Sequence, residues 1–171
     1  IGMTTAPIFQ PGADGINCTP PVPPQIFLRI GGIQNNNGVV DGGTQNVPVE
    51  VDGVVRGFLP ILFTPPTFVG SNPARIGLGT GGSITLRTAQ AQVDGQSYPI
   101  NRASFCLVNA PTVSPSNPVV VRKLDANGGT ISTTNLTSPN QCYDDFSLNW
   151  FALYVAATLG GLDLRDFLFK P

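Results

Sequence analysis

Short runs in which apolar residues occur at every second position, separated by glycine-containing turns, extend along most of this chain. Valines alternate with other residues in the segment 47–52, and the segment 83–88 repeats the alternation. A period of two places the apolar side chains on one face of a strand. Asn or Asp directly precedes Gly at Asp14-Gly15, Asn37-Gly38, Asp41-Gly42, Asp52-Gly53, Asp94-Gly95 and Asn127-Gly128. Such dipeptides favour hairpin turns, so the pattern predicts an all-β domain.

About eight or nine strands follow from this pattern, with no convincing amphipathic helix between them. Residues 150–157 are apolar throughout, which predicts a central strand buried on both faces, with a helix as the alternative. Residues 162–169 fit a strand or a short helical turn. Pro60 indicates an edge strand or a bulge, because proline cannot donate to a ladder. The other strands are expected at 25–33, 47–52, 54–56, 58–63, 83–88, 98–108 and 119–124, and residues 67–69 leave room for a further short strand.

Three segments are interpreted as loops from their glycine, proline, asparagine, serine and threonine content. They are 34–46, 70–82 and 130–139, the last with room for one short strand. Many short strands with long connections favour a two-sheet sandwich, and eight strands favour a jelly roll. We therefore expect a single jelly-roll or β-sandwich barrel domain over residues 25–171.

Residues 1–24 differ from the rest in being rich in proline, with pairs at Pro20-Pro21 and Pro23-Pro24. They predict an extended N-terminal arm that either crosses its own domain or reaches a neighbour. The chain has 20 Gly and 17 Pro, which is close to the content of disordered chains. The strand-length apolar runs argue against disorder, so the prolines are expected to stiffen loops.

Charge is sparse, at 11% of residues and a net value of −1. The arginines are scattered, and no stretch concentrates positive charge. Binding of nucleic acid through its phosphates needs a basic face, so direct contact with nucleic acid is not expected. A nearly neutral surface also gives little repulsion between copies, which favours self-association.

The chain has no histidine, which excludes Ser-His-Asp and Cys-His pairs and removes the commonest zinc ligand. We expect no enzyme activity, no catalytic, cofactor-binding or metal-binding residues, and no small-molecule substrate. Cys106 lies in the apolar run 103–108 and is predicted to be a small buried hydrophobic side chain. Cys18 and Cys142 lie in loop-like segments and could pair, which the sequence does not decide.

Three further patterns have a chemical and a structural interpretation. The segment 77–82 matches G-x-G-x-x-G, but a β pattern follows it where a dinucleotide site needs a helix, so we expect a surface loop. The acids Asp144, Asp145, Asp163 and Asp166 could form carboxylate pairs or hold calcium, but are interpreted as solvated loop acids. An aromatic cluster fits either a sugar-stacking platform or, more often, the core. It comprises Tyr143, Phe146, Trp150, Phe151 and Tyr154.

The proline-rich arm, the strand rhythm after it and the weakly charged, Asn/Thr/Gly-rich loops together resemble a known family. It is the small single-jelly-roll major capsid proteins of tailless icosahedral bacteriophages with an internal membrane, a group that includes phages of Thermus. The resemblance covers residues 3–171 and rests on layout, without a signature motif. It implies a location in the virion. Copies would form dimers or larger capsomers with other capsid proteins, tiling a shell that contacts a membrane vesicle indirectly.

The residues therefore favour a structural protein that self-assembles through barrel surfaces and arm. The alternative is a receptor- or carbohydrate-binding β-sandwich module, such as a phage fibre head or adhesin, that grips its ligand with loops 34–46 and 70–82. A hydrolase built on the carboxylates is a third hypothesis. No charged start followed by an apolar stretch is visible, so no secretory signal is expected.

Overall fold

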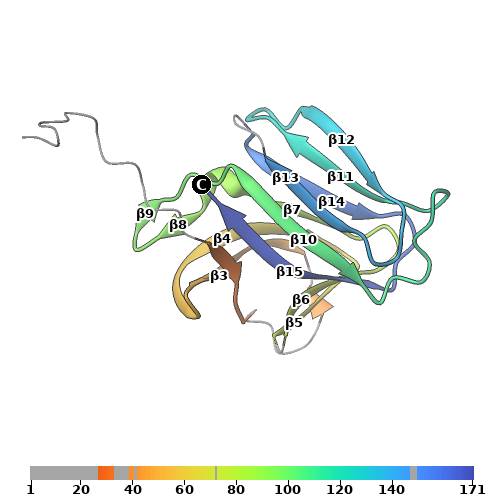
Figure 1. The fold of residues 1–171 in the computed structure, drawn as a ribbon, viewed down its shortest axis with the longest axis horizontal. Coiled ribbons are helices and arrows are strands. Elements are labelled where there is room, and N and C mark those ends of the chain that lie inside the picture. The colour runs from red at the N-terminus through yellow and green to blue at the C-terminus, as the bar shows by residue number, and fades with distance from the viewer. Residues whose placement is uncertain (1–26, 33–38, 41, 72, 147–149) are drawn as a thin grey trace, which may run out of the picture.

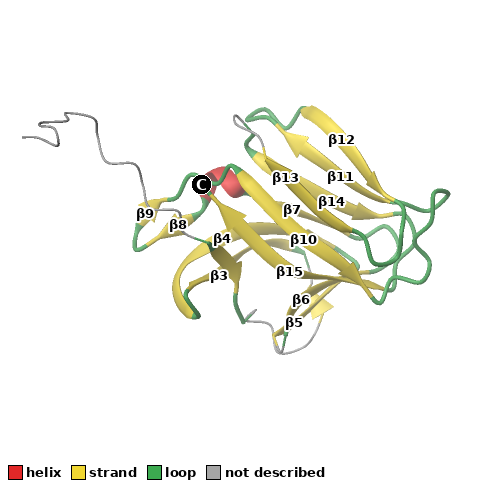
Figure 2. Cartoon of the chain, in the orientation of Figure 1, coloured by secondary structure: helices red, strands yellow, loops and turns green. Residues whose placement is uncertain are grey.

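The computed structural model describes residues 27–32, 39–40, 42–71, 73–146 and 150–171, and this part of the chain is all-β (Figure 1, Figure 2). It forms one continuous antiparallel sheet of fifteen strands. A single 3₁₀ turn, η1 (Thr88–Gln90), is the one helical element in these ranges. The predicted all-β class is confirmed, whereas the strand count exceeds the expected eight or nine. The expected arm at 1–24 lies outside the described residues.

One branch of the sheet has the order β12-β11-β14-β7-β4-β3-β1. Every neighbouring pair in this branch is antiparallel. Its strands are β1 (Leu28–Ile30), β3 (Gly43–Val51), β4 (Val54–Thr64), β7 (Ser83–Leu86), β11 (Val119–Leu124), β12 (Thr130–Leu136) and β14 (Ala152–Ala157).

The other branch is built around the last strand, β15 (Leu162–Lys170). One side of β15 pairs with β10, which in turn pairs with β13. The other side pairs with β1 and then with β6, from which the order continues through β5 to β2. The bounds of these strands are β2 (Val39–Val40), β5 (Thr67–Ser71), β6 (Ala74–Leu78), β10 (Arg102–Val108) and β13 (Cys142–Phe146). A small hairpin of β8 (Gln92–Val93) and β9 (Gln96–Ser97) attaches to β4.

The sheet folds over itself, so that the β13-β10-β15 part lies in front of the strands β14, β7 and β4 in Figure 1. The two layers enclose one cluster of buried apolar side chains. Phe63, Phe105 and Phe169 are the largest side chains that are fully buried. Burying aromatic and branched side chains between two layers is the main driving force for such a fold.

The period-two pattern correctly identified the inward face of several strands. Val47, Val49 and Val51 are buried in β3, and Leu28 and Ile30 are buried in β1. The predicted central strand is confirmed as β14, between β11 and β7, and is not a helix. Alternate positions of β14 are only half-buried, so its outer face is not fully covered. The C-terminal segment is a strand throughout.

Two of the Asp-Gly dipeptides form two-residue hairpin turns, as predicted. Asp52 and Gly53 have φ angles of 52° and 80°, and Asp94 and Gly95 have φ angles of 53° and 78°. Positive φ at both central positions is the type I′ geometry, whose twist matches that of the flanking strands. The first turn joins β3 to β4 and the second joins β8 to β9.

The other dipeptides behave differently. Gly128 ends a turn between β11 and β12, in which the Asp125 carboxylate accepts hydrogen bonds from the amides of Asn127 and Gly129. Gly42 lies between β2 and β3, which pair with the different strands β5 and β4. The prediction of a hairpin there is wrong, because the chain passes from one branch of the sheet to the other. Asp14-Gly15, Asn37-Gly38 and Asp41 lie outside the described residues.

All three predicted loops contain strand. The segment 34–46 includes β2 and the start of β3, the segment 70–82 includes β6, and the segment 130–139 includes β12. The strands in the first two segments escaped prediction because β2 is short and β6 contains glycine. The one short strand allowed for in 130–139 is present as β12, although six of its seven residues are exposed and show no alternation. The strand expected from residue 98 begins at Arg102.

Pro60 does not mark an edge strand. β4 pairs with β3 along one side, and with β8 and β7 along the other. The Pro60 carbonyl accepts a hydrogen bond from the Arg87 amide at 2.9 Å, so the ring nitrogen faces the same side, between the β8 and β7 pairings. No ladder bond is needed from that position, which explains why proline is tolerated inside a paired strand.

Candidate functional site

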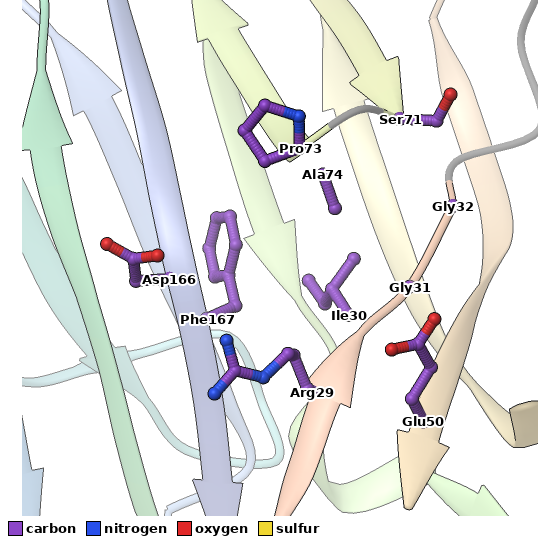
Figure 3. A pocket seen from close by; sticks show the side chains of 10 residues that line it. All are labelled: Arg29, Ile30, Gly31, Gly32, Glu50, Ser71, Pro73, Ala74, Asp166 and Phe167. Carbon is purple, nitrogen blue, oxygen red and sulfur yellow. The ribbon is translucent and has the colours of Figure 1, made fainter. Parts of the chain in front are cut away.

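A shallow pocket of about 200 Å³ lies where β15 changes its partner from β1 to β6 (Figure 3). β1 pairs with Leu168 and Phe169, and β6 pairs with the stretch from Leu162 to Arg165. Between these pairings, the register of β15 against β10 shifts and Asp166 has a φ of 60°. A bulge of this kind redirects side chains, and aspartate tolerates the left-handed conformation.

The pocket has an apolar floor and a charged rim. Ile30 and Phe167, both buried, form the floor. Arg29, Glu50 and Asp166 lie around it, contributed by three different strands (Figure 3). Because these residues are far apart in sequence, only the register of β1 between β3 and β15 brings them together.

Glycine shapes one wall of this pocket. A Cβ atom at Gly31 would lie 2.6 Å from Oε2 of Glu50, so the carboxylate occupies the space that a side chain would need. Arg29 and Glu50 are cross-strand partners, yet neither forms an ion pair within the described ranges. The site therefore offers a guanidinium donor and carboxylate acceptors for hydrogen bonds, without a nucleophile and base in contact.

A second shallow pocket lies on the other side of Arg29 and shares Arg29 and Glu50 with the first. Phe27 forms part of its wall and is 50% exposed. The Lys170 ammonium lies 4.6 Å from the centre of the Phe27 ring, a cation–π contact. No local sequence pattern indicates either pocket, since both depend on strand register.

The four acids singled out from the sequence were expected in loops, but they lie on strands β13 and β15, in different surroundings. Asp144 forms an exposed ion pair with Arg102, whose Nη2 lies 2.6 Å from Oδ2. Asp163 accepts a hydrogen bond from Asn109 at 3.2 Å, and Asp166 lies in the first pocket. Asp144 and its neighbour Asp145 point to opposite faces of β13, as expected for successive strand residues. Within the described ranges, no three potential metal ligands lie close enough together to bind an ion.

Asp145 belongs to a polar network between the two layers. Its Oδ2 lies 2.9 Å from Lys123 Nζ and accepts a hydrogen bond from the Tyr143 hydroxyl at 2.8 Å. Burial raises the pKa of Asp145, but the hydrogen bonds from Lys123 and Tyr143 outweigh that effect and hold the pKa below its usual value. Burial, followed by the hydrogen bond to Asp145, raises the pKa of Tyr143. The network bridges β11 and β13, which no strand pairing connects within the described part of the chain.

Asp144 and Asp94 also have lowered pKa values. The hydrogen bond from Arg102 lowers the pKa of Asp144, and the hydrogen bond from Arg56 lowers that of Asp94. Both ion pairs lie at the surface, where such pairs contribute little to stability.

The aromatic cluster does not form one platform. Tyr143 is buried and stacks on Phe105 with ring centres 5.4 Å apart, and Trp150 is also buried. Tyr154 lies on the outer face of the other layer, where the Arg122 guanidinium is 5.6 Å from its ring centre. Phe146 is 66% exposed at the edge of β13. Core residues and separate surface residues therefore account for the cluster.

The glycine-rich segment continues from β6 into a turn before β7, where Gly82 donates a hydrogen bond to the Gly79 carbonyl. A strand and not a helix follows it. The N-terminus of a helix, which a dinucleotide site would use for phosphate, is missing from this stretch of the described chain. Close packing explains the glycines, because a Cβ atom at Gly79 would lie 2.8 Å from the Pro66 ring.

The predicted state of Cys106 is wrong, because Cys106 and Cys142 form a disulfide. The two residues lie directly opposite each other on β10 and β13. Ala103, Phe105 and Leu107 are buried, so Cys106 faces outward and is half-buried. The alternation of the segment 103–108 was the signal that could have shown this. Cys142 is thus not joined to Cys18, which lies outside the described residues.

No protein-family model matches this chain, and no curated protein matches it. No helix within the described residues is long and apolar enough to cross a membrane.

The strand β12 forms one end of the first branch, and among the described residues its one strand partner is β11. It contains no proline and no charged residue, and Ile131 on it is 51% exposed. Edge strands in soluble proteins are commonly protected by charge, proline or a cover. The outer edge of β12 therefore offers backbone donors and acceptors to another strand.

Proposed function

We propose that this chain is a structural subunit that associates with copies of itself and, as a capsid protein, with other shell proteins in a virion. The observation that carries the proposal is the open edge of β12. A strand from another copy can extend the sheet there by main-chain hydrogen bonds. Exposed side chains on β12 are mostly threonine, serine and asparagine, which do not repel an approaching strand.

Exposed apolar side chains elsewhere support the same proposal. Phe146 on β13 and Phe68 on β5 are 66% and 44% exposed, and both strands lie at or beside the end of a sheet path. Val54 and Val55 are exposed next to the β3–β4 turn. Scattered apolar residues are normal on a surface, but here they accompany a net charge of only −1. Association would bury them against little electrostatic repulsion.

For the finer description of the fold we propose a jelly-roll type of sandwich. Its support is that the chain alternates between the two branches. β3 and β4 belong to the first branch, β5 and β6 to the second, and β7 to the first again. After β10 the chain crosses to β11 and β12, returns to β13, crosses to β14 and ends in β15. Repeated crossings between two sheets are typical of jelly rolls and of the shell proteins that use them.

Light scattering after size-exclusion chromatography tests the proposal, over protein concentrations from micromolar to millimolar. We expect the mass to exceed that of the 17.9 kDa chain and to rise with concentration. Electron microscopy of the largest species should show regular contacts between copies. A protein that remains a monomer throughout this range would contradict the proposal.

The variant Thr133→Lys tests whether copies contact each other through the edge of β12. Thr133 is exposed on β12, so a lysine there leaves the fold intact while placing charge at the edge. We expect dissociation at concentrations at least tenfold higher than those at which the unmodified protein dissociates. Ser116→Lys, on an exposed turn, is the matched control for the charge change. Equal effects of the two lysines would exclude β12 as the contact.

A further inference from the structure

A third pocket, of about 300 Å³, lies on the outer face of the first branch, away from the two pockets around Arg29. Leu62 and Thr85 are opposite each other on β4 and β7 and form its base. Leu124 and Phe151 add apolar surface, and Arg87 lies among these residues. The pocket is shallow, its volume is at the lower limit of small-molecule sites, and like them it has an apolar lining with few polar groups.

The walls of this pocket are fixed by hydrogen bonds. The Phe151 amide donates to the Leu124 carbonyl at 2.8 Å, and the Phe151 carbonyl accepts from the Thr88 hydroxyl at 3.0 Å. The Arg87 amide donates to Pro60 on β4. A site held in this way loses little entropy when a ligand enters.

Arg87 has no acidic partner within the described part of the chain. Its Nε is buried and makes no hydrogen bond. Among the described residues its terminal nitrogens make no hydrogen bond either, and they are not among the fully buried atoms; Arg87 is one of the residues that line the pocket. A guanidinium presents donors in a planar fork that matches a carboxylate.

One acid, Asp125, also lines the pocket. Its Oδ1 already accepts hydrogen bonds from the amides of Asn127 and Gly129, at 2.9 and 2.8 Å. It is therefore committed to the β11–β12 turn and does not neutralise Arg87. Its charge disfavours a ligand with two negative charges, because like charges repel more strongly next to low-dielectric protein.

We propose that this pocket binds a small monocarboxylate with an apolar body. The carboxylate contacts the terminal nitrogens of Arg87, and the body covers Leu62, Leu124 and Phe151. The apolar lining distinguishes this ligand class from inorganic anions, and the guanidinium distinguishes it from neutral apolar molecules. The assignment is independent of the proposed self-association, because it uses a sheet face and not the edge of β12.

The test is a titration of the ¹⁵N-labelled full chain with hexanoate, followed by NMR. We expect saturable shifts at the amides of Thr85, Ala126 and Gly128, with a dissociation constant on the order of 1 mM. Hexanol, which has the same apolar body, should bind at least tenfold more weakly. Inorganic phosphate should produce no saturable shifts at these amides. Equal affinities for hexanoate and hexanol, or the absence of saturable shifts, would overturn the proposal.

Two variants test whether the preference for a carboxylate depends on Arg87 or on surface charge in general. Arg87→Gln should remove the tenfold preference for hexanoate over hexanol. Arg122→Gln is the matched control, since Arg122 lies on the same branch over Tyr154 and does not line the pocket. A preference that survives Arg87→Gln, or is lost equally in Arg122→Gln, would contradict the assignment. The shift map of the unmodified protein decides the question even if Arg87→Gln does not fold.

Discussion

Lys123 and Asp145 show how a single pair can join two layers of a folded sheet. Both side chains are mostly buried, with 12% and 29% exposure, and Tyr143 donates a hydrogen bond to the same carboxylate. A buried charge is tolerated only when it is paired and hydrogen-bonded. The network is a contact between β13 of one layer and β11 of the other, so it helps to hold the edge of one layer over the other.

Asp145→Asn should lower the free energy of unfolding at pH 7 by about 1–3 kcal/mol, because Lys123 keeps its charge without a carboxylate. The control is Asp144→Asn, which makes the same chemical change on the opposite face of β13. Its pair with Arg102 is exposed to solvent and should contribute little, so the loss should be clearly smaller. Urea denaturation of both variants measures the difference.

The same two variants give the dependence on pH. The folded-state pKa of Asp145 is lowered, so its contribution is present above the unfolded value of about 4 and is lost as pH falls through the folded value. The stability gap between the unmodified protein and Asp145→Asn should therefore narrow below about pH 4. A gap that stays constant down to pH 2 would show that the charge of Asp145 is not the stabilising feature.

At the scale of elements, β13 depends on β10, its one strand partner among the described residues. The disulfide joins the two strands across 36 positions of sequence. Closing a loop of that length stabilises a fold by about 3–4 kcal/mol, largely by restricting the unfolded chain. Cys142 is exposed, so a reductant can reach the bond.

Reduction with a phosphine should lower the free energy of unfolding by about 3–4 kcal/mol, measured by urea denaturation with and without reductant. Hydrogen exchange should increase first in β13. Cys18→Ser is the control and should keep the full sensitivity to reductant, because Cys18 is not the partner of Cys142. If Cys18→Ser abolished the sensitivity, the pairing would be wrong.

Two glycines near the β3–β4 hairpin, Gly53 and Gly57, are required for different physical reasons. Gly53 has a positive φ, but no atom lies within 4 Å of an added Cβ, so Gly53→Ala should cost about 1 kcal/mol from backbone conformation alone. An added Cβ at Gly57 would overlap the Gln92 carbonyl of β8. Gly57→Ala should therefore cost about 3 kcal/mol. Thermal denaturation compares the two, and equal losses would contradict this distinction.

At the scale of the whole molecule, β15 connects the branches, because it pairs with β10, β1 and β6. One apolar cluster lies between the layers and includes residues from both. Neither layer has a separate core, so we expect the domain to unfold as one cooperative unit. Fluorescence of Trp150, the sole tryptophan, and far-ultraviolet circular dichroism should give coincident urea transitions. Two separate transitions would show that the layers are independent.

Strands with one solvent-exposed face and one buried face could be predicted from the sequence, because burial repeats at every second residue. β3 and β7 are examples, and the Asp52-Gly53 and Asp94-Gly95 turns were recognised from their conformational preference. β12 and β6 could not be predicted in this way. β12 is an exposed edge strand without alternation, and its pairing with β11 is what makes it a strand. The position of β6 in the sheet depends on its pairing with β15.

The sequence by itself determined the fold class, the inward faces of the alternating strands and two tight turns, since each depends on residues close together in the chain. Only the tertiary structure decided that Cys106 pairs with Cys142, that Lys123 reaches Asp145, and which residues line the pockets. These features require strands distant in sequence to be placed in register. Register depends on the packing of all the strands together, which no local pattern contains.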